Sequence, residues 1–154
     1  MAVLSPELRA WILPGLAGTI ATVTSSLQPQ MARVWAARAH PALDIIEVYA
    51  LRSQVSTLLE GTNRRIALSL IDVPTYRSRM FKGSYDVSPD QPDAALLQES
   101  LAEFNRAVAS VGMAPDTAER ILSHDDAPRL LVALRITAEI VFDQSPKPGA
   151  GAPL

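Results

Sequence analysis

The sequence predicts a mainly β domain, an α+β arrangement in which six antiparallel strands form a barrel with peripheral helices. Segments with alternating side-chain character recur along the chain, and a period of two residues is typical of strands. Short turn signals join the first three of these segments, which favours an antiparallel meander over strand–helix–strand units. Fewer segments show the spacing of apolar side chains that is typical of helices.

The first half of the chain carries a short helix, three strands and a second helix. The first helix is expected at residues 6–11, and the three strands at residues 19–24, 30–39 and 43–50. Ser25 and Ser26 mark the first turn, and His40 and Pro41 mark the second. Residues 53–61 have helical spacing and end at a glycine, which predicts one or two helical turns.

The second half alternates again, becomes helical and ends in a long strand. Strands are expected at residues 65–72 and 76–87, and a helix at residues 92–111. A further helix is expected from Pro115, since proline is tolerated in a first helical turn. The last strand covers residues 130–143, with the even-numbered positions from Leu130 to Phe142 on one face. Residues 145–154 are rich in proline and glycine and are expected to form an extended surface arm.

Length and composition narrow the function classes. The 154 residues suit one domain over residues 1–154, and there is no internal repeat. A net charge of −2 gives no electrostatic reason to expect nucleic acid or an anionic membrane as partner. Cysteine is absent, which excludes disulfides, thiolate metal sites and a cysteine nucleophile. With no leader-like start and no long apolar run, a soluble, cytoplasmic protein is expected.

The two histidines do not indicate a catalytic or metal site. His124 follows Ser123 and precedes Asp125, but adjacency in sequence does not make a catalytic triad, which depends on geometry. His40 stands before a proline, and the pair lacks ligand-type spacing for zinc. Loop or helix-capping roles are expected for both, with no metal ligand and no catalytic residue assigned.

Four segments carry a resemblance to a known family. They lie at residues 18–35, 59–68, 76–83 and 142–151. In order and spacing they resemble the flavin-binding split barrel of the pyridoxamine-phosphate-oxidase-like superfamily. The resemblance implies a homodimer with two cofactor sites between its subunits and a small-molecule substrate. FMN is the preferred cofactor, with deazaflavin or haem as alternatives.

The resemblance also implies which residues bind the cofactor. Arg33, Arg52, Ser53 and Arg77 match phosphate-binding positions, Gln54 lies in the phosphate-binding turn, and Val34, Trp35 and Ser78 match positions near the flavin ring. The turn departs from the family pattern, because it supplies one cation and no lysine. The expected activity is electron transfer between a reduced flavin and a small acceptor. The alternative is a non-catalytic ligand-binding barrel that has lost flavin.

Several of these residues also have ordinary structural interpretations. Arg33 could face solvent or pair with an acid, and Trp35 could belong to the core or a dimer interface. Arg77 and Arg79 share a strand face and could form a solvated edge or an ion pair at a subunit interface. Lys82 and Gly83 could mark a bulge instead of a binding requirement.

Overall fold

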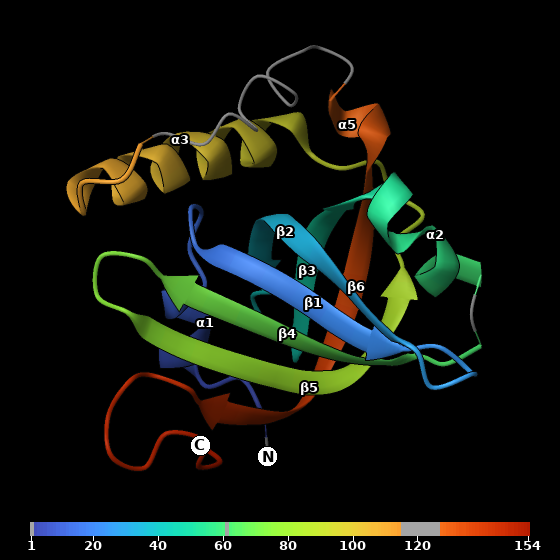
Figure 1. Cartoon of the computed structure of the whole chain (residues 1–154), viewed down its shortest axis with the longest axis horizontal. Coiled ribbons are helices and arrows are strands. Elements are labelled where there is room, and N and C mark those ends of the chain that lie inside the picture. The colour runs from blue at the N-terminus through green and yellow to red at the C-terminus, as the bar shows by residue number, and fades with distance from the viewer. Residues whose placement is uncertain (1, 61, 115–126) are drawn as a thin grey trace.

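The computed structural model describes residues 2–60, 62–114 and 127–154 (Figure 1). Its strands are β1 (Ala17–Val23), β2 (Pro29–Ala39), β3 (Ile45–Leu51), β4 (Arg65–Asp72), β5 (Arg77–Val87) and β6 (Leu131–Asp143). They form one closed antiparallel barrel in the order β1-β2-β3-β6-β5-β4. The predicted fold class is therefore confirmed, and the first three strands form the expected meander.

The described helices are α1 (Pro6–Trp11), α2 (Arg52–Glu60), α3 (Ala94–Ser110) and α5 (Ala127–Leu130). Helix α1 precedes β1 and helix α2 follows β3, and the two lie at opposite ends of the barrel (Figure 1). None of the described helices is both long enough and apolar enough to cross a bilayer. The helix expected from Pro115 and the predicted role of His124 concern residues outside the described ranges.

The barrel interior is filled by one face of each strand. Ile20, Leu68, Leu70 and Phe81 are at most 1% exposed, and they come from three adjacent strands. A second apolar cluster lies outside the barrel, where Leu97 and other side chains of α3 pack on the outer faces of β2, β3 and β6. Strands β2, β3 and β6 are thus covered on both faces over part of their length.

The predicted face of the last strand holds from Val132 to Ala138, whereas Leu130, expected to begin it, ends α5 and is 47% exposed. Beyond Ala138 the expectation is wrong, because Ile140 is 39% exposed and Val141 is 2% exposed. The cause is a bulge: Gly83 pairs with Ala138 and Lys82 with Ile140, so one residue of β6 has no partner and the alternation reverses. A Cβ atom on Gly83 would lie 1.8 Å from the Thr137 carbonyl oxygen. This confirms the bulge interpretation of Lys82 and Gly83.

The C-terminal segment turns back on β6 and is not the extended arm expected from its composition. The Asp143 amide donates to the Ala152 carbonyl at 3.0 Å, and the Leu154 amide donates to the Val141 carbonyl at 2.9 Å. Gly149 and Gly151 have φ angles of +86° and +90°, which glycine adopts without steric cost. The glycines that suggested an irregular arm therefore allow a tight reversal.

Arg79 attaches this returning segment to the barrel. Its guanidinium pairs with Asp143 at 2.7 Å and donates to the Ser145 hydroxyl at 2.9 Å, while Lys147 pairs with the same carboxylate at 2.7 Å. Arg79 is therefore not the solvated edge considered for it: its ion pair lies within the chain and joins β5, β6 and the C-terminal segment.

Candidate functional site

A hollow of about 450 Å³ lies on the outer face of β1, β2 and β4, beside α3. Arg33, Thr19 and Ser69 lie in one row across it, because Thr19 pairs with Arg33 on one side and with Ser69 on the other. Gln54 of α2 and Phe104 of α3 complete its polar and aromatic lining. The hollow thus combines a cation, two hydroxyls, an amide and an aromatic ring.

The Arg33 side chain stacks on aromatic rings from two elements. Its guanidinium carbon lies 4.1 Å from the centroid of the Trp35 ring and 5.0 Å from that of Phe104. Cation–π contacts use the flat face of the guanidinium and are compatible with hydrogen bonds along its edge. Arg33 is half-buried, so its position is set by packing as well as by charge.

A bulge in β2 determines where the neighbours of Arg33 point. Val34 pairs with Ala50 and Ala36 with Tyr49, so Trp35 is the extra residue. Val34 points into the barrel core and is 3% exposed, which leaves only its backbone at the outer face. Trp35 packs against the outer cluster under α3, and its buried indole N–H has no hydrogen-bond partner among the described residues.

The two other predicted groups lie apart from the hollow. Arg52 and Ser53 are exposed in the first turn of α2 and are not among the lining residues, unlike Gln54. Arg77 is exposed at the start of β5. Ser78 is buried, and its amide donates to the Ser145 hydroxyl at 3.1 Å. Of the eight predicted residues, only Arg33 and Gln54 line the hollow.

Among the lining residues that sequence reasoning missed, Thr19, Ser69 and Phe104 supply hydroxyl groups and an aromatic ring. Thr19 and Ser69 meet because β1 pairs with β4, and a pairing between distant segments leaves no local signal. Phe104 lies on the apolar stripe of α3, which predicts packing but not the partner. No local pattern distinguishes Phe104 from its buried neighbours Leu101 and Val108.

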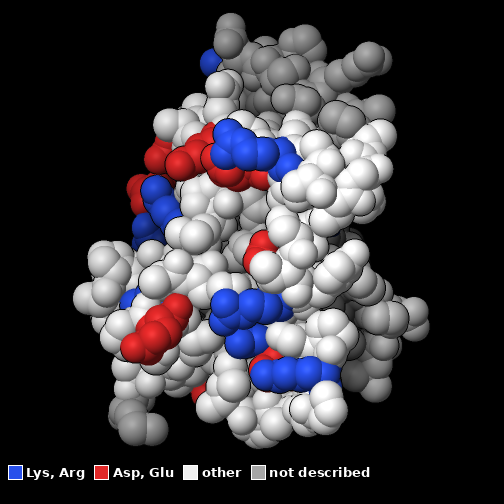
Figure 2. All heavy atoms as spheres, turned by 90° about the vertical axis from the view of Figure 1, so that its left-hand side faces the viewer, with Lys and Arg blue, Asp and Glu red and all other residues white. Residues whose placement is uncertain are grey.

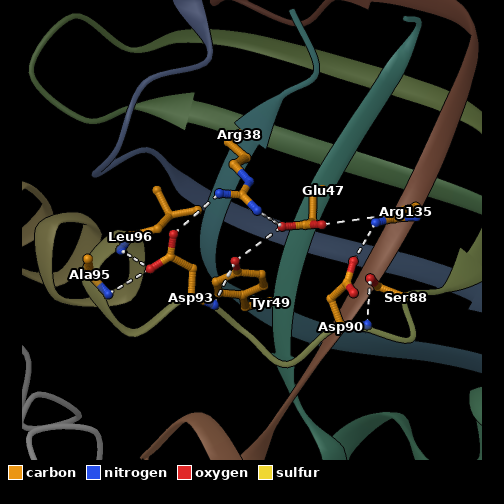
Figure 3. Close-up of polar contacts among 9 residues, drawn as sticks. All are labelled: Arg38, Glu47, Tyr49, Ser88, Asp90, Asp93, Ala95, Leu96 and Arg135. Atoms are coloured by element: carbon orange, nitrogen blue, oxygen red, sulfur yellow. Dashed lines mark hydrogen bonds and ion pairs between the residues drawn. The ribbon is translucent and has the colours of Figure 1, made fainter.

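A polar cluster fixes the start of α3 against the barrel (Figure 3). The Tyr49 hydroxyl donates to Glu47 at 3.1 Å and accepts from the Asp93 amide at 3.0 Å. Arg38 pairs with Glu47 at 2.7 Å and with Asp93 at 3.4 Å. Burial raises the pKa of Tyr49, so the hydroxyl keeps its proton and can donate.

The charges of this cluster are largely matched within the chain. Arg135 pairs with Asp90 at 2.8 Å and lies 3.8 Å from Glu47 (Figure 3). The Asp93 carboxylate caps α3 by accepting from the amides of Ala95 and Leu96. Because each cation in the cluster faces a carboxylate, its arrangement suits a structural role in holding α3.

Next to the hollow, the barrel has an open face that consists of Ala21, Met31, Ala67, Ile71 and Ile140, with the exposed Lys82 between Ala67 and Ile140. Met31, Ala21 and Ala67 share one row, and Met31 lines both the first hollow and a second one of about 420 Å³. Met31 is 69% exposed, Ile71 38% and Ile140 39%. No described helix lies in front of β1, β4 and β5 (Figure 1). Such apolar exposure is typical of interaction sites.

Other side chains give little sign of a further site. His40 accepts from the amides of Ala42 and Leu43 at 3.1 and 3.0 Å, which confirms its predicted loop role. Within the described ranges, no three His, Asp or Glu side chains gather in a way that could hold a metal. On the face shown in Figure 2, basic and acidic groups are interspersed and form no continuous patch of one sign.

Several solved structures are similar to this chain in fold. No protein-family model and no curated protein sequence matches the chain. One solved structure that matches is the conserved hypothetical protein Rv2991 from Mycobacterium tuberculosis, with 23% identity over 91% of this chain and 84% of that one and a TM-score of 0.53. An F420 reductase matches with 17% identity over 86% of this chain and 94% of that one and a TM-score of 0.51.

A third match is a protein from Lactobacillus delbrueckii that is provisionally named a pyridoxamine 5'-phosphate oxidase. It is 16% identical over 90% of this chain and 93% of that one, with a TM-score of 0.50. At these identities the likeness establishes the fold and not the activity. The chain therefore has the split-barrel fold of pyridoxamine-phosphate-oxidase-like proteins, as its four sequence segments implied.

Proposed function

We propose that this protein binds a flavin-type cofactor, with FMN preferred, and transfers electrons between the reduced flavin and a small acceptor. The observation that carries the proposal is the hollow in which Arg33, Thr19, Ser69 and Gln54 come together on the outer face of a split barrel. The likeness to an F420 reductase supports a flavin-type cofactor, although it concerns another protein.

The lining of the hollow fits the phosphate of FMN. A guanidinium is the preferred partner of a phosphate because its planar fork of N–H groups matches two oxygens. Arg33 supplies that fork, and the hydroxyls of Thr19 and Ser69 lie in the same row and can donate to further oxygens. We assign no phosphate contact to Arg52, Ser53 or Arg77, since none of them lines the hollow.

The open face fits the flat ring system. Ala21 and Ala67 are paired neighbours with small side chains, so the sheet surface there is shallow and apolar. Met31 borders both hollows and can adapt its flexible thioether chain to a planar ligand. In this arrangement the phosphate and the ring occupy adjacent parts of one sheet surface.

We further propose that two copies of the chain associate through the open face. Met31, Ile71 and Ile140 would leave water on association, and the apolar area that they bury favours the dimer. The partner copy would also cover the side of the cofactor that one subunit leaves exposed to solvent. The homodimer expected from the sequence thus has a definite candidate surface.

A bound flavin supplies the redox chemistry, so the chain needs no catalytic triad. Its own residues bind and orient. Arg33 would hold the phosphate, Ala21 and Ala67 would support the ring, and the partner copy would exclude water from the face that is otherwise exposed. Backbone amides of β1, β2 and β4 are engaged in the barrel, which keeps this surface rigid.

The test is a visible absorbance spectrum of the freshly purified protein, followed by titration of the stripped protein with FMN. We expect flavin bands, and we expect Arg33→Ala to weaken FMN binding about tenfold or more, the size of one charge-assisted hydrogen bond. Arg106→Ala is the matched control, because that arginine is exposed and pairs only with Glu103 among the contacts described. A colourless protein that ignores FMN would contradict the flavin assignment.

A deazaflavin is the second candidate, and the likeness to an F420 reductase favours it. Competition between the two cofactors decides, because both would use the Arg33 hollow. If F420 binds and FMN does not, the site belongs to the deazaflavin. A haem signal in the spectrum would favour the haem alternative, and binding of neither flavin would favour the non-catalytic one.

A further inference from the structure

We propose that Phe104 is a positioning residue. Together with Trp35 it fixes the plane of the Arg33 guanidinium, so that Arg33 selects a phosphate monoester in the hollow. The inference rests on the proposed flavin site and deepens it, because it names the feature that would separate phosphorylated from unphosphorylated flavin. Nothing in the local sequence around Phe104 indicates this role.

The rings of Trp35 and Phe104 both contact the Arg33 guanidinium, whose carbon lies 4.1 and 5.0 Å from their centroids. The two rings belong to different elements. Trp35 lies on the same strand as Arg33, whereas Phe104 reaches it from α3. An arginine side chain has several rotatable bonds, and a single neighbouring ring leaves most of them undetermined. A second ring from another element restricts the side chain further, and a pre-oriented fork loses less entropy when it binds an oxyanion.

Phe104 can set the position of Arg33 only if α3 is itself fixed, and the structure shows three attachments. The polar cluster of Tyr49 and Asp93 holds its first turn (Figure 3). Leu97 packs in the outer cluster at 1% exposure. Near Phe104, Gly15 lies so close that a Cβ atom there would be 2.5 Å from the Cβ of Glu103. The helix is therefore attached in its first turn, by a polar and an apolar contact, and again beside Phe104.

The composition of the hollow indicates the anion. Arg33 brings one positive charge, and Thr19 and Ser69 bring neutral donors in the same row. A carboxylate has two oxygens, which a single fork satisfies, whereas a phosphate monoester presents additional oxygens that hydroxyls can meet. A cation with two flanking hydroxyls therefore suits a phosphate better than a carboxylate.

The experiment compares the affinities for FMN and riboflavin in the full-length protein. The ratio of the two dissociation constants isolates the contribution of the phosphate. We expect a clear preference for FMN in the wild type and a preference about tenfold smaller in Arg33→Ala. Phe104→Leu should lower the ratio by about three- to tenfold, the range of a cation–π contact, with riboflavin affinity unchanged. Tyr76→Leu is the control, since Tyr76 is exposed and lies outside the hollow.

Two results would overturn the proposal. If Phe104→Leu weakens FMN and riboflavin equally, Phe104 supports the fold and not Arg33. If the ratio stays at its wild-type value, Arg33 needs no second ring. Circular dichroism of each variant shows whether the fold is retained, and Phe104→Tyr, which keeps the ring, should restore the ratio.

A second measurement is independent of flavin. Trp11 and Trp35 are the only tryptophans, so a Trp11→Phe background makes Trp35 the sole indole reporter. Titration with inorganic phosphate should change its fluorescence, and the response should be lost in Arg33→Ala and weakened in Phe104→Leu. That pattern would uphold the positioning role even if both flavins failed to bind and the proposed function fell. The absence of any response in the Trp11→Phe protein would refute it.

Discussion

The Tyr49 hydroxyl accepts a 3.0 Å hydrogen bond from the backbone amide of Asp93, which is the residue that caps α3. Tyr49 is 1% exposed and lies on β3, so this contact joins the barrel wall to the start of the helix. The same hydroxyl donates to Glu47, and both of its hydrogen-bonding functions are therefore used.

Tyr49→Phe should lower the free energy of unfolding by about 1–3 kcal/mol, because it leaves the Asp93 amide without its partner and removes one donor from Glu47, which keeps its ion pair with Arg38. Urea denaturation measures the loss, and hydrogen exchange should show faster opening of the first turn of α3 than of β3. Tyr76→Phe, at an exposed tyrosine, is the control and should leave stability unchanged. Equal stability of the two variants would show that the contact contributes nothing.

Gly83→Ala should destabilise the fold strongly. The added Cβ would overlap the Thr137 carbonyl oxygen, and the strands β5 and β6 must separate to relieve the overlap. We expect a loss of about 3 kcal/mol or more, measured by the urea midpoint.

Gly112→Ala provides the matched control for that loss. Gly112 has a φ of +77°, and within the described ranges nothing beyond its chain neighbours lies within 4 Å of an added Cβ. Its substitution therefore reports backbone strain alone, at about 1 kcal/mol. If both variants lost the same amount, the tight approach of β5 and β6 at Gly83 would have no energetic consequence.

Most of the fold could be predicted from the sequence because strand periodicity is local. The element at residues 65–72 has the same bounds in the structure as in the prediction, and residues 6–11 form the expected helix. The bulges at Trp35 and opposite Lys82–Gly83 were harder to predict, since the position of each bulge depends on the register with a partner strand. A bulge reverses the alternation, which is why the face of β6 changed after Ala138.

The site was predictable only in part, because its residues meet through pairings that are distant in sequence. Arg33 and Gln54 could be identified from the resemblance, but Ser69 reaches the hollow through the closure of the barrel between β1 and β4. Ser78 was expected near a ring, yet the reversal of the C-terminal segment buries it beneath Ser145. A cytoplasmic location remains a prediction from composition.

Acid should destabilise the attachment of the C-terminal segment through Asp143. The Lys147 ammonium, then the amide and hydroxyl of Ser145, and the Arg79 guanidinium hold the pKa of Asp143 well below its usual range. A carboxyl whose pKa is lower in the folded state adds stability above its unfolded pKa of about 3.9, and this contribution declines as the pH falls below that value.

The stability difference between wild type and Asp143→Asn should therefore be largest near neutral pH and should shrink in acid. Urea denaturation of both proteins at a series of pH values measures it, and other carboxyl groups cancel in the difference. Asp86→Asn, at an exposed aspartate on β5, serves as the control and should show little dependence. A difference that stays constant through the acid range would contradict the charge-based account.

Ala67→Arg should convert the proposed dimer to a monomer. Ala67 lies in the middle of the open face, between Ala21 and Lys82, and an arginine there would place a second cation beside Lys82 in an apolar contact. Light scattering after size exclusion measures the mass, with circular dichroism to confirm folding. Ala102→Arg, on the exposed side of α3, is the control. A dimer that survives Ala67→Arg would have to use another surface.

Variants of Gln54 and Arg52 test where the phosphate binds. The hollow is lined by Gln54, whereas the resemblance in sequence implied a phosphate contact by Arg52. Both lie in the first turn of α2, but only Gln54 lines the hollow. We therefore expect Gln54→Ala to weaken FMN several-fold, by about the value of one neutral hydrogen bond, and Arg52→Ala to have a smaller effect. Isothermal titration at two salt concentrations distinguishes contact from long-range attraction, since screening removes only the latter. A larger, salt-resistant effect at Arg52 would place the phosphate at the helix start and outside the Arg33 hollow.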